Sequence, residues 1–153
     1  MKKRLLLFAF SAFALSSCKE DDDIQHYEMD MLKGEWRTAK MEIISGADDK
    51  TIITTDVPMG CNMKSTTEFR TDHYTAYTAF SGIESSCTSD KIEGTYDYDT
   101  ETKTMVIKYE NESPRPYKII YLNSTELKLQ QLYDNIDYNG DFKIDKIYTT
   151  YKR

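Results

Sequence analysis

The chain has 153 residues, of which 20 are basic and 26 acidic, giving a net charge of −6 at pH 7. Residues 1–17 contain three of the basic residues and none of the acidic ones, so the chain without this segment carries −9. Such an acidic chain lacks the basic face that binding to nucleic acid or to anionic lipid headgroups requires. Its length is that of one ordinary domain.

The first seventeen residues have the three parts of a secretory signal peptide. Residues 2–4 are basic, residues 5–15 are apolar, and the Leu-Ser-Ser-Cys sequence at 15–18 forms a cleavage site that ends at Cys18. A transmembrane anchor is the alternative, but a spanning helix needs about 20 apolar residues. The segment resembles the lipobox of bacterial lipoproteins. This implies that cleavage makes Cys18 the new N-terminal residue and that Cys18 carries acyl chains such as palmitate.

Residues 18–26 are predicted to be a tether between the lipid and a folded domain. Lys19 is followed by four acidic residues at 20–23, and a short run of like charges stays solvated. This run also resembles the acidic export signal of surface lipoproteins in gut and oral Gram-negative anaerobes. Two or three acyl chains anchor a domain almost permanently. We therefore expect a protein anchored by lipid to the outer membrane and exposed at the cell surface.

Beyond the tether, the chain consists of short segments in which apolar and polar residues alternate. In residues 91–99, for example, tyrosines alternate with aspartates, the pattern of a strand with one buried and one solvated face. Residues 111–116 are predicted to be a loop, because Pro114 and Pro116 cannot donate to a central ladder. Nine strands are predicted, at 37–44, 51–57, 65–70, 74–80, 91–99, 103–110, 117–122, 126–133 and 141–151.

Two interpretations compete for the segment before the last predicted strand. Asn139-Gly140 is typical of a two-residue hairpin turn. Oxygen-bearing side chains at alternate positions are also typical of the start of a calcium loop. The hairpin is favoured, because Lys146 stands twelfth from Asn135, where an EF-hand has a glutamate. The candidate calcium ligands would be Asn135, Asp137, Asn139 and Asp141.

The cysteine count is consistent with one disulfide. Once Cys18 is lipidated, Cys61 and Cys87 remain as an even pair in an oxidising compartment. A bridge between them would stabilise the fold by about 3.5 kcal/mol on the chain-entropy model. The alternative is two buried thiols.

Antiparallel strands at this spacing form a barrel or a sandwich, and a short motif favours the barrel. Gly34-Glu35-Trp36, after the short amphipathic stretch 27–33, resembles the G-x-W motif that opens the lipocalin fold. The resemblance implies an all-β domain over 27–153: an antiparallel up-and-down barrel of about eight strands, with a short 3₁₀ or helical plug. It also implies that Trp36 packs at the barrel base beside an arginine, for which Arg153 is the candidate. The second and third lipocalin motifs have no other counterpart, so an open barrel is an alternative.

A barrel of this kind holds one small ligand in its interior or fills the space with side chains. The alternation predicts an inward set that is apolar with hydroxyl tips, suited to an amphipathic molecule. The alternative is that these residues are simply core, and for any single one of them that interpretation is favoured. The candidate ligand-binding residues are Tyr74, Phe80, Tyr96, Tyr98, Met105, Ile107, Tyr109, Leu129 and Tyr133.

The sequence contains no recognisable catalytic motif. Its two histidines, His26 and His73, have no serine or cysteine nucleophile arranged nearby in sequence, and no phosphate-binding or metalloprotease motif is present. We expect no enzymatic activity, cofactor or structural metal. Two functions remain: a surface-anchored barrel that binds a small lipophilic ligand, or an accessory or adhesion lipoprotein with a solid core whose outer surface binds a protein or glycan.

Overall fold

A computed structural model describes residues 27–83 and 86–153. The predictions for residues 1–26, including the signal peptide, Cys18 and the tether, lie outside this part of the chain. In the described part, residues 27–32 are helical and no helix is long and apolar enough to cross a membrane. The remaining elements are β1 (Gly34–Ile44), β2 (Ile52–Asp56), the 3₁₀ helix η1 (Gly60–Lys64), β3 (Thr66–Phe69), β4 (Tyr74–Ile83), β5 (Ser86–Asp99), β6 (Thr104–Tyr109), β7 (Arg115–Leu122), β8 (Glu126–Gln131) and β9 (Lys146–Lys152).

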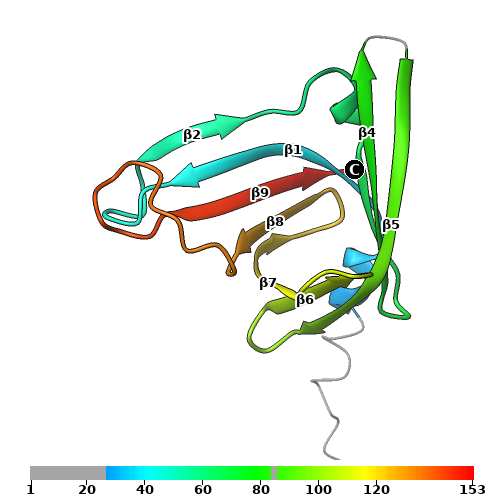
Figure 1. The fold of residues 1–153 in the computed structure, drawn as a ribbon. Helices are drawn as coiled ribbons and strands as arrows, with labels where there is room; N and C mark the ends of the chain where they lie inside the picture. Colours follow the sequence, from blue (N-terminus) through cyan, green and yellow to red (C-terminus); the bar gives the residue numbers. More distant parts are fainter. Residues whose placement is uncertain (1–26, 84–85) are drawn as a thin grey trace, which may run out of the picture.

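Eight of these strands form a closed antiparallel barrel (Figure 1). Strands β3 to β9 pair in chain order, and β1 pairs with both β3 and β9, which closes the sheet. The sequence did not decide between a barrel and a sandwich, or between an open and a closed barrel. The pairing of β1 with β9 shows a closed barrel.

The ninth strand, β2, lies outside this cycle but on the same side of β1 as β3. Met41–Ile44 of β1 pair with β2, whereas Gly34–Arg37 pair with β3. Residues 57–65 leave the sheet between these two pairings and include η1. The wall of the barrel is therefore interrupted beside the middle of β1.

The β4–β5 hairpin is longer than the sequence predicts. Residues 81–90 were predicted to be a loop, but β4 continues to Ile83 and β5 begins at Ser86. This extension is rich in serine and threonine and solvated on both faces, so it shows no alternation of apolar and polar residues. It rises as a two-stranded ribbon beyond the rest of the barrel (Figure 1).

Other boundaries differ from prediction as well: β1 begins at Gly34 and not at 37, and β8 ends at Gln131 and not at 133. Pro116 was placed in a loop, but it lies in β7 opposite Val106. It is the second residue of that strand, and proline is compatible with a strand start. Residues 141–145 were predicted to be strand, but they belong to the long 132–145 connection between β8 and β9.

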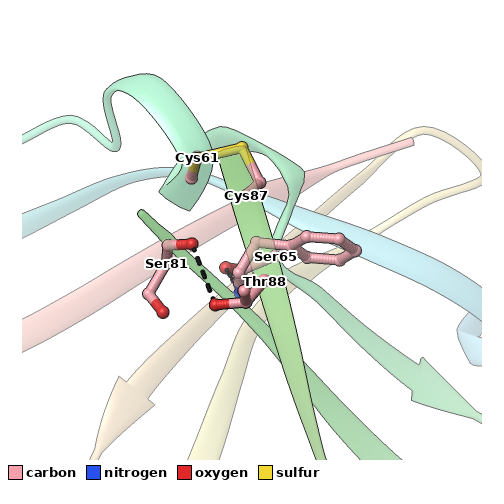
Figure 2. The surroundings of a disulfide bond; sticks show 6 residues. Cys61, Ser65, Ser81, Cys87 and Thr88 are labelled. Carbon is pink, nitrogen blue, oxygen red and sulfur yellow. Dashed lines mark hydrogen bonds between the residues drawn. A yellow bond between two sulfur atoms is a disulfide. The ribbon is translucent and has the colours of Figure 1, made fainter. Parts of the chain in front are cut away.

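A disulfide joins Cys61 of η1 to Cys87 of β5, with a Cα–Cα distance of 5.5 Å (Figure 2). This confirms the predicted pair. Nearby, the Ser65 hydroxyl accepts a hydrogen bond from the Phe80 amide at 2.9 Å, and the Thr88 hydroxyl donates to the Ser81 carbonyl at 3.4 Å. An isolated two-stranded ribbon is marginally stable in water, and the disulfide and the Ser65–Phe80 hydrogen bond fasten this hairpin to the segment that interrupts the wall.

Candidate functional site

One end of the barrel is closed by the helical residues 27–32 and by Trp36. The Trp36 side chain is fully buried, and its indole N–H donates to the Leu32 carbonyl at 2.7 Å. The Arg153 guanidinium lies 4.0 Å from the indole ring centroid and donates to the Met31 carbonyl at 2.7 Å. Gly34 has a φ of +119°, and a Cβ there would meet the same guanidinium at 3.6 Å. The structure thus places Gly34, Trp36 and Arg153 together, where the lipocalin resemblance implied them.

Two tyrosines of β5 lie next to this closed end and hold the helical residues against the barrel through contacts with Met29 and Glu28. Tyr96 packs edge-on against Phe69 with ring centroids 5.1 Å apart, and its hydroxyl donates to the Arg70 carbonyl at 2.7 Å. Tyr98 donates to the Glu28 carboxylate, which also pairs with Lys103. Burial raises the pKa of Tyr96 to about 12, so its hydroxyl remains a donor at physiological pH.

Above this base, the barrel contains a cavity of about 450 Å³. The cavity lies toward the end of the barrel that carries the β6–β7 turn, where Glu112 lies in the turn and Arg115 begins β7. The Arg70–His73 turn is at the opposite, closed end, where the His73 carbonyl accepts a hydrogen bond from the Tyr96 amide. The lining residues are Thr38, Met41, Asp56, Thr67, Phe69, Tyr77, Ile92, Ile107, Tyr109, Glu112, Arg115, Tyr117, Gln131, Tyr133, Thr149 and Tyr151.

Tyrosines dominate this lining. Tyr117 and Tyr133 meet edge to face with centroids 5.4 Å apart, and their hydroxyl oxygens are 3.2 Å apart. Burial raises the pKa of Tyr109 to about 12 and raises the pKa values of Tyr117 and Tyr151 well above the ordinary range. These phenols are therefore neutral and can both donate and accept hydrogen bonds.

A single ion pair lies among the lining residues. Nη2 of Arg115 is 2.7 Å from Oε2 of Glu112, three positions earlier in the chain. The Arg115 guanidinium also lies 5.9 Å from the Tyr133 ring centroid. The Arg115 and Glu112 side chains are 39% and 34% exposed, so solvent screens both charges and the pair contributes little to stability.

The predicted ligand-binding residues divide into three groups, of which two lie inside the barrel and the third, described below, lies outside. Ile107, Tyr109 and Tyr133 line the cavity. Tyr96, Tyr98, Met105 and Leu129 are buried in the core instead.

Tyr74 and Phe80 were predicted to point into the barrel, and this is wrong. Tyr74 donates to Glu93 on the exposed face at 2.8 Å, and Phe80 lines a separate depression with Met63 and Lys64. In β4, Thr75 is fully buried and Tyr77 lines the cavity. The inward set of β4 is therefore offset by one residue from the predicted one, which exchanges the two faces of a strand.

Several cavity residues were not predicted. Tyr117 and Tyr151 lie within predicted strands, and the alternation of 117 with 119 could have revealed Tyr117. Arg115 and Glu112 were hidden because 111–116 was treated as a loop. Met41 and Thr38 flank a register shift between Thr38 and Lys40 in β1, which breaks the regular alternation.

The loop 132–145 forms neither a two-residue hairpin nor a cluster of carboxylates. The Asp137 carboxylate accepts hydrogen bonds from the backbone amides of Gly140 and Phe142, each at 2.7 Å. Buried Asp145 accepts from the amides of Gly46 and Tyr138. Across residues 27–83 and 86–153, no group of three or more His, Cys, Asp or Glu residues is placed to hold a metal ion.

Comparison with known proteins identifies a family whose model matches this chain. A model of the lipocalin-like domain matches residues 32–129, and no curated protein matches the chain. Similar solved structures include a bovine odorant-binding protein, a deswapped triple mutant with 16% identity and a TM-score of 0.40, covering 80% of this chain and 74% of its own. The bovine lipocalin allergen Bos d 2 has 14% identity and a TM-score of 0.41, with coverage of 82% and 75%. Aphrodisin, a sex pheromone from female hamster, has 13% identity and a TM-score of 0.39, with coverage of 80% and 74%.

Proposed function

Because this chain belongs to the family of lipocalin-like domains, we propose that its barrel binds one small lipophilic or amphipathic molecule in the cavity above Phe69. The observation that carries the proposal is the asymmetry of the barrel. Trp36 and Arg153 close one end, whereas about 450 Å³ of space remains toward the other. A cavity of this volume is within the range of small-molecule sites.

The cavity also bears on the competing function. An accessory or adhesion lipoprotein with a solid core would need the inward tyrosines to fill the barrel, and Tyr117, Tyr133 and Tyr151 instead line open space. Members of the family are generally binding and transport proteins, so we propose no enzymatic activity.

We further propose that the barrel is anchored at the cell surface through Cys18. The support is the sequence of residues 1–23, with a lipobox-like segment followed by four acids. Replacing Cys18 with alanine is expected to release the protein from membranes and to abolish labelling by an alkyne analogue of palmitate. Persistent labelling of this variant would contradict the anchor.

Ligand capture is tested by native mass spectrometry of the domain 27–153 purified from its own host, followed by binding of the neutral fluorescent probe N-phenyl-1-naphthylamine. The variant Thr149→Phe adds bulk to the cavity lining and is expected to weaken probe binding at least tenfold. Thr54→Phe adds the same ring to an exposed position on β2 and serves as the control. Equal probe binding by both variants would contradict a ligand site inside the barrel.

A further inference from the structure

We propose that the cavity selects a neutral aromatic molecule with hydroxyl or carbonyl oxygens over a saturated acyl chain and over anionic ligands. This inference rests on the proposed function and specifies the chemistry of its ligand. Three features of the lining carry it: the scarcity of wholly apolar residues, the tyrosine faces and hydroxyls, and the excess of acidic over basic side chains.

The lining is too polar for a saturated chain. Of the sixteen lining residues, only Met41, Phe69, Ile92 and Ile107 have no polar side-chain atom able to form a strong hydrogen bond. A saturated chain in this space would remove water from tyrosine and threonine hydroxyls and give them no hydrogen bond in return. An unpaired buried hydroxyl is costly, so such a ligand loses affinity at each one.

The tyrosines offer an aromatic ligand both ring contacts and hydrogen bonds. Tyr77, Tyr109, Tyr117, Tyr133 and Tyr151 come from strands β4, β6, β7 and β9 and from the residues just after β8, so they surround the space. Tyr117 and Tyr133 already pack edge to face, an arrangement that a further ring can extend. Ligand oxygens placed among neutral phenols can accept or donate hydrogen bonds, and this gives orientation as well as affinity.

The charges of the lining disfavour an anionic ligand. An anion would compete with Glu112 for Arg115, and Asp56 is a second carboxylate among the lining residues. Two acidic side chains therefore face one basic side chain, and their charge opposes the binding of an anion.

Four ligands of matched size test the inference by titration calorimetry at pH 7: 2-naphthol, naphthalene, 2-naphthoate and laurate. 2-Naphthol is neutral and carries one hydroxyl, naphthalene lacks it, 2-naphthoate is ionised, and laurate is a saturated chain with a charge. We expect 2-naphthol to bind at least tenfold more tightly than each of the other three.

Single-atom variants then locate the selectivity. Tyr117→Phe and Tyr133→Phe are expected to weaken 2-naphthol binding about five- to tenfold and to leave naphthalene binding within twofold. Naphthalene thus shows that each variant is folded and keeps its cavity. Tyr74→Phe removes a hydroxyl on the outer face and is expected to change neither ligand.

Two variants test the role of the charges by removing one charge of the Glu112–Arg115 pair at a time. Glu112→Gln leaves Arg115 uncompensated and is expected to raise 2-naphthoate affinity about tenfold. Arg115→Gln leaves Glu112 uncompensated and should raise the affinity for 2-naphthylmethylamine, the matched cation, by a similar factor.

The results separate this inference from the proposed function. If naphthalene or laurate binds as tightly as 2-naphthol, or if the tyrosine variants leave 2-naphthol affinity unchanged, the selectivity is wrong while the cavity still binds ligands. If none of the four ligands binds and N-phenyl-1-naphthylamine also fails, the proposed function itself is wrong.

Discussion

The guanidinium of Arg153 lies 4.0 Å from the ring centroid of Trp36 and also hydrogen-bonds to the carbonyls of Met31 and Lys33. One side chain thus fastens the helical residues 27–32, the first strand and the last strand at the same place. The attraction between a guanidinium and an indole face adds to these hydrogen bonds because the indole is fully buried.

Trp36→Ala is expected to lower the free energy of unfolding by about 3–5 kcal/mol, because it removes the largest fully buried side chain of the base. Arg153→Lys keeps the charge but loses the planar fork, and a loss of about 1 kcal/mol is expected. Urea denaturation monitored by far-UV circular dichroism measures both. An unfolding free energy unchanged by Trp36→Ala would contradict the role of the base.

Gly94→Ala tests the close approach of β5 and β6. A Cβ at Gly94 would lie 2.2 Å from the Lys108 carbonyl oxygen and 2.8 Å from the Tyr109 Cα, so the strands must separate. We expect a loss of about 1–3 kcal/mol in the free energy of unfolding. Gly140→Ala is the matched control: it has open space around the added carbon and only a positive φ of +76°, so a smaller loss of about 1 kcal/mol is expected.

Reduction of the Cys61–Cys87 bridge, or the double change to serine, is expected to lower the free energy of unfolding by about 3.5 kcal/mol. The largest local effect should appear in the extended β4–β5 hairpin, which the bridge fastens to η1. Amide hydrogen exchange with and without reductant measures it, with β8 as an internal reference. Equal changes in β8 and in residues 79–83 would show that the bridge acts globally.

Acid is expected to destabilise the wall formed by β1, β8 and β9 through Glu42. A hydrogen bond from Lys40 at 2.7 Å, with the Lys40 and Lys128 charges, lowers the pKa of this buried carboxyl below its ordinary value, although burial opposes the shift. The unfolded chain then binds the proton more readily, so this stabilisation is present at pH 7 and is lost as pH falls below about 4. Thermal melts of wild type and Glu42→Gln should therefore differ at pH 7 and converge near pH 3. A difference independent of pH would contradict the role of the charge.

The sequence predicted the fold better than it predicted the site. Alternation in 91–99 and 103–110 predicted β6 and the part of β5 that pairs with it, because each has one buried and one solvated face. The same rule failed in β4, where Tyr74 is aromatic yet lies outside while the smaller Thr75 is fully buried. A different rule failed at Arg115 and Pro116. Proline indicated a loop there, although these two residues begin β7. Residue type alone does not show which face of a short strand is enclosed; pairing with β3 and β5 decides it.

The seam between β1 and β9 joins residues roughly a hundred positions apart, such as Ile43 and Ile147. Because closing such a long loop costs entropy before the pairing compensates for it, we expect this seam to form later than the local hairpins. Before it forms, β1 and β9 each present an unpaired edge able to capture a foreign strand. A chaperone that shields these edges would therefore act in the interval between hairpin formation and closure.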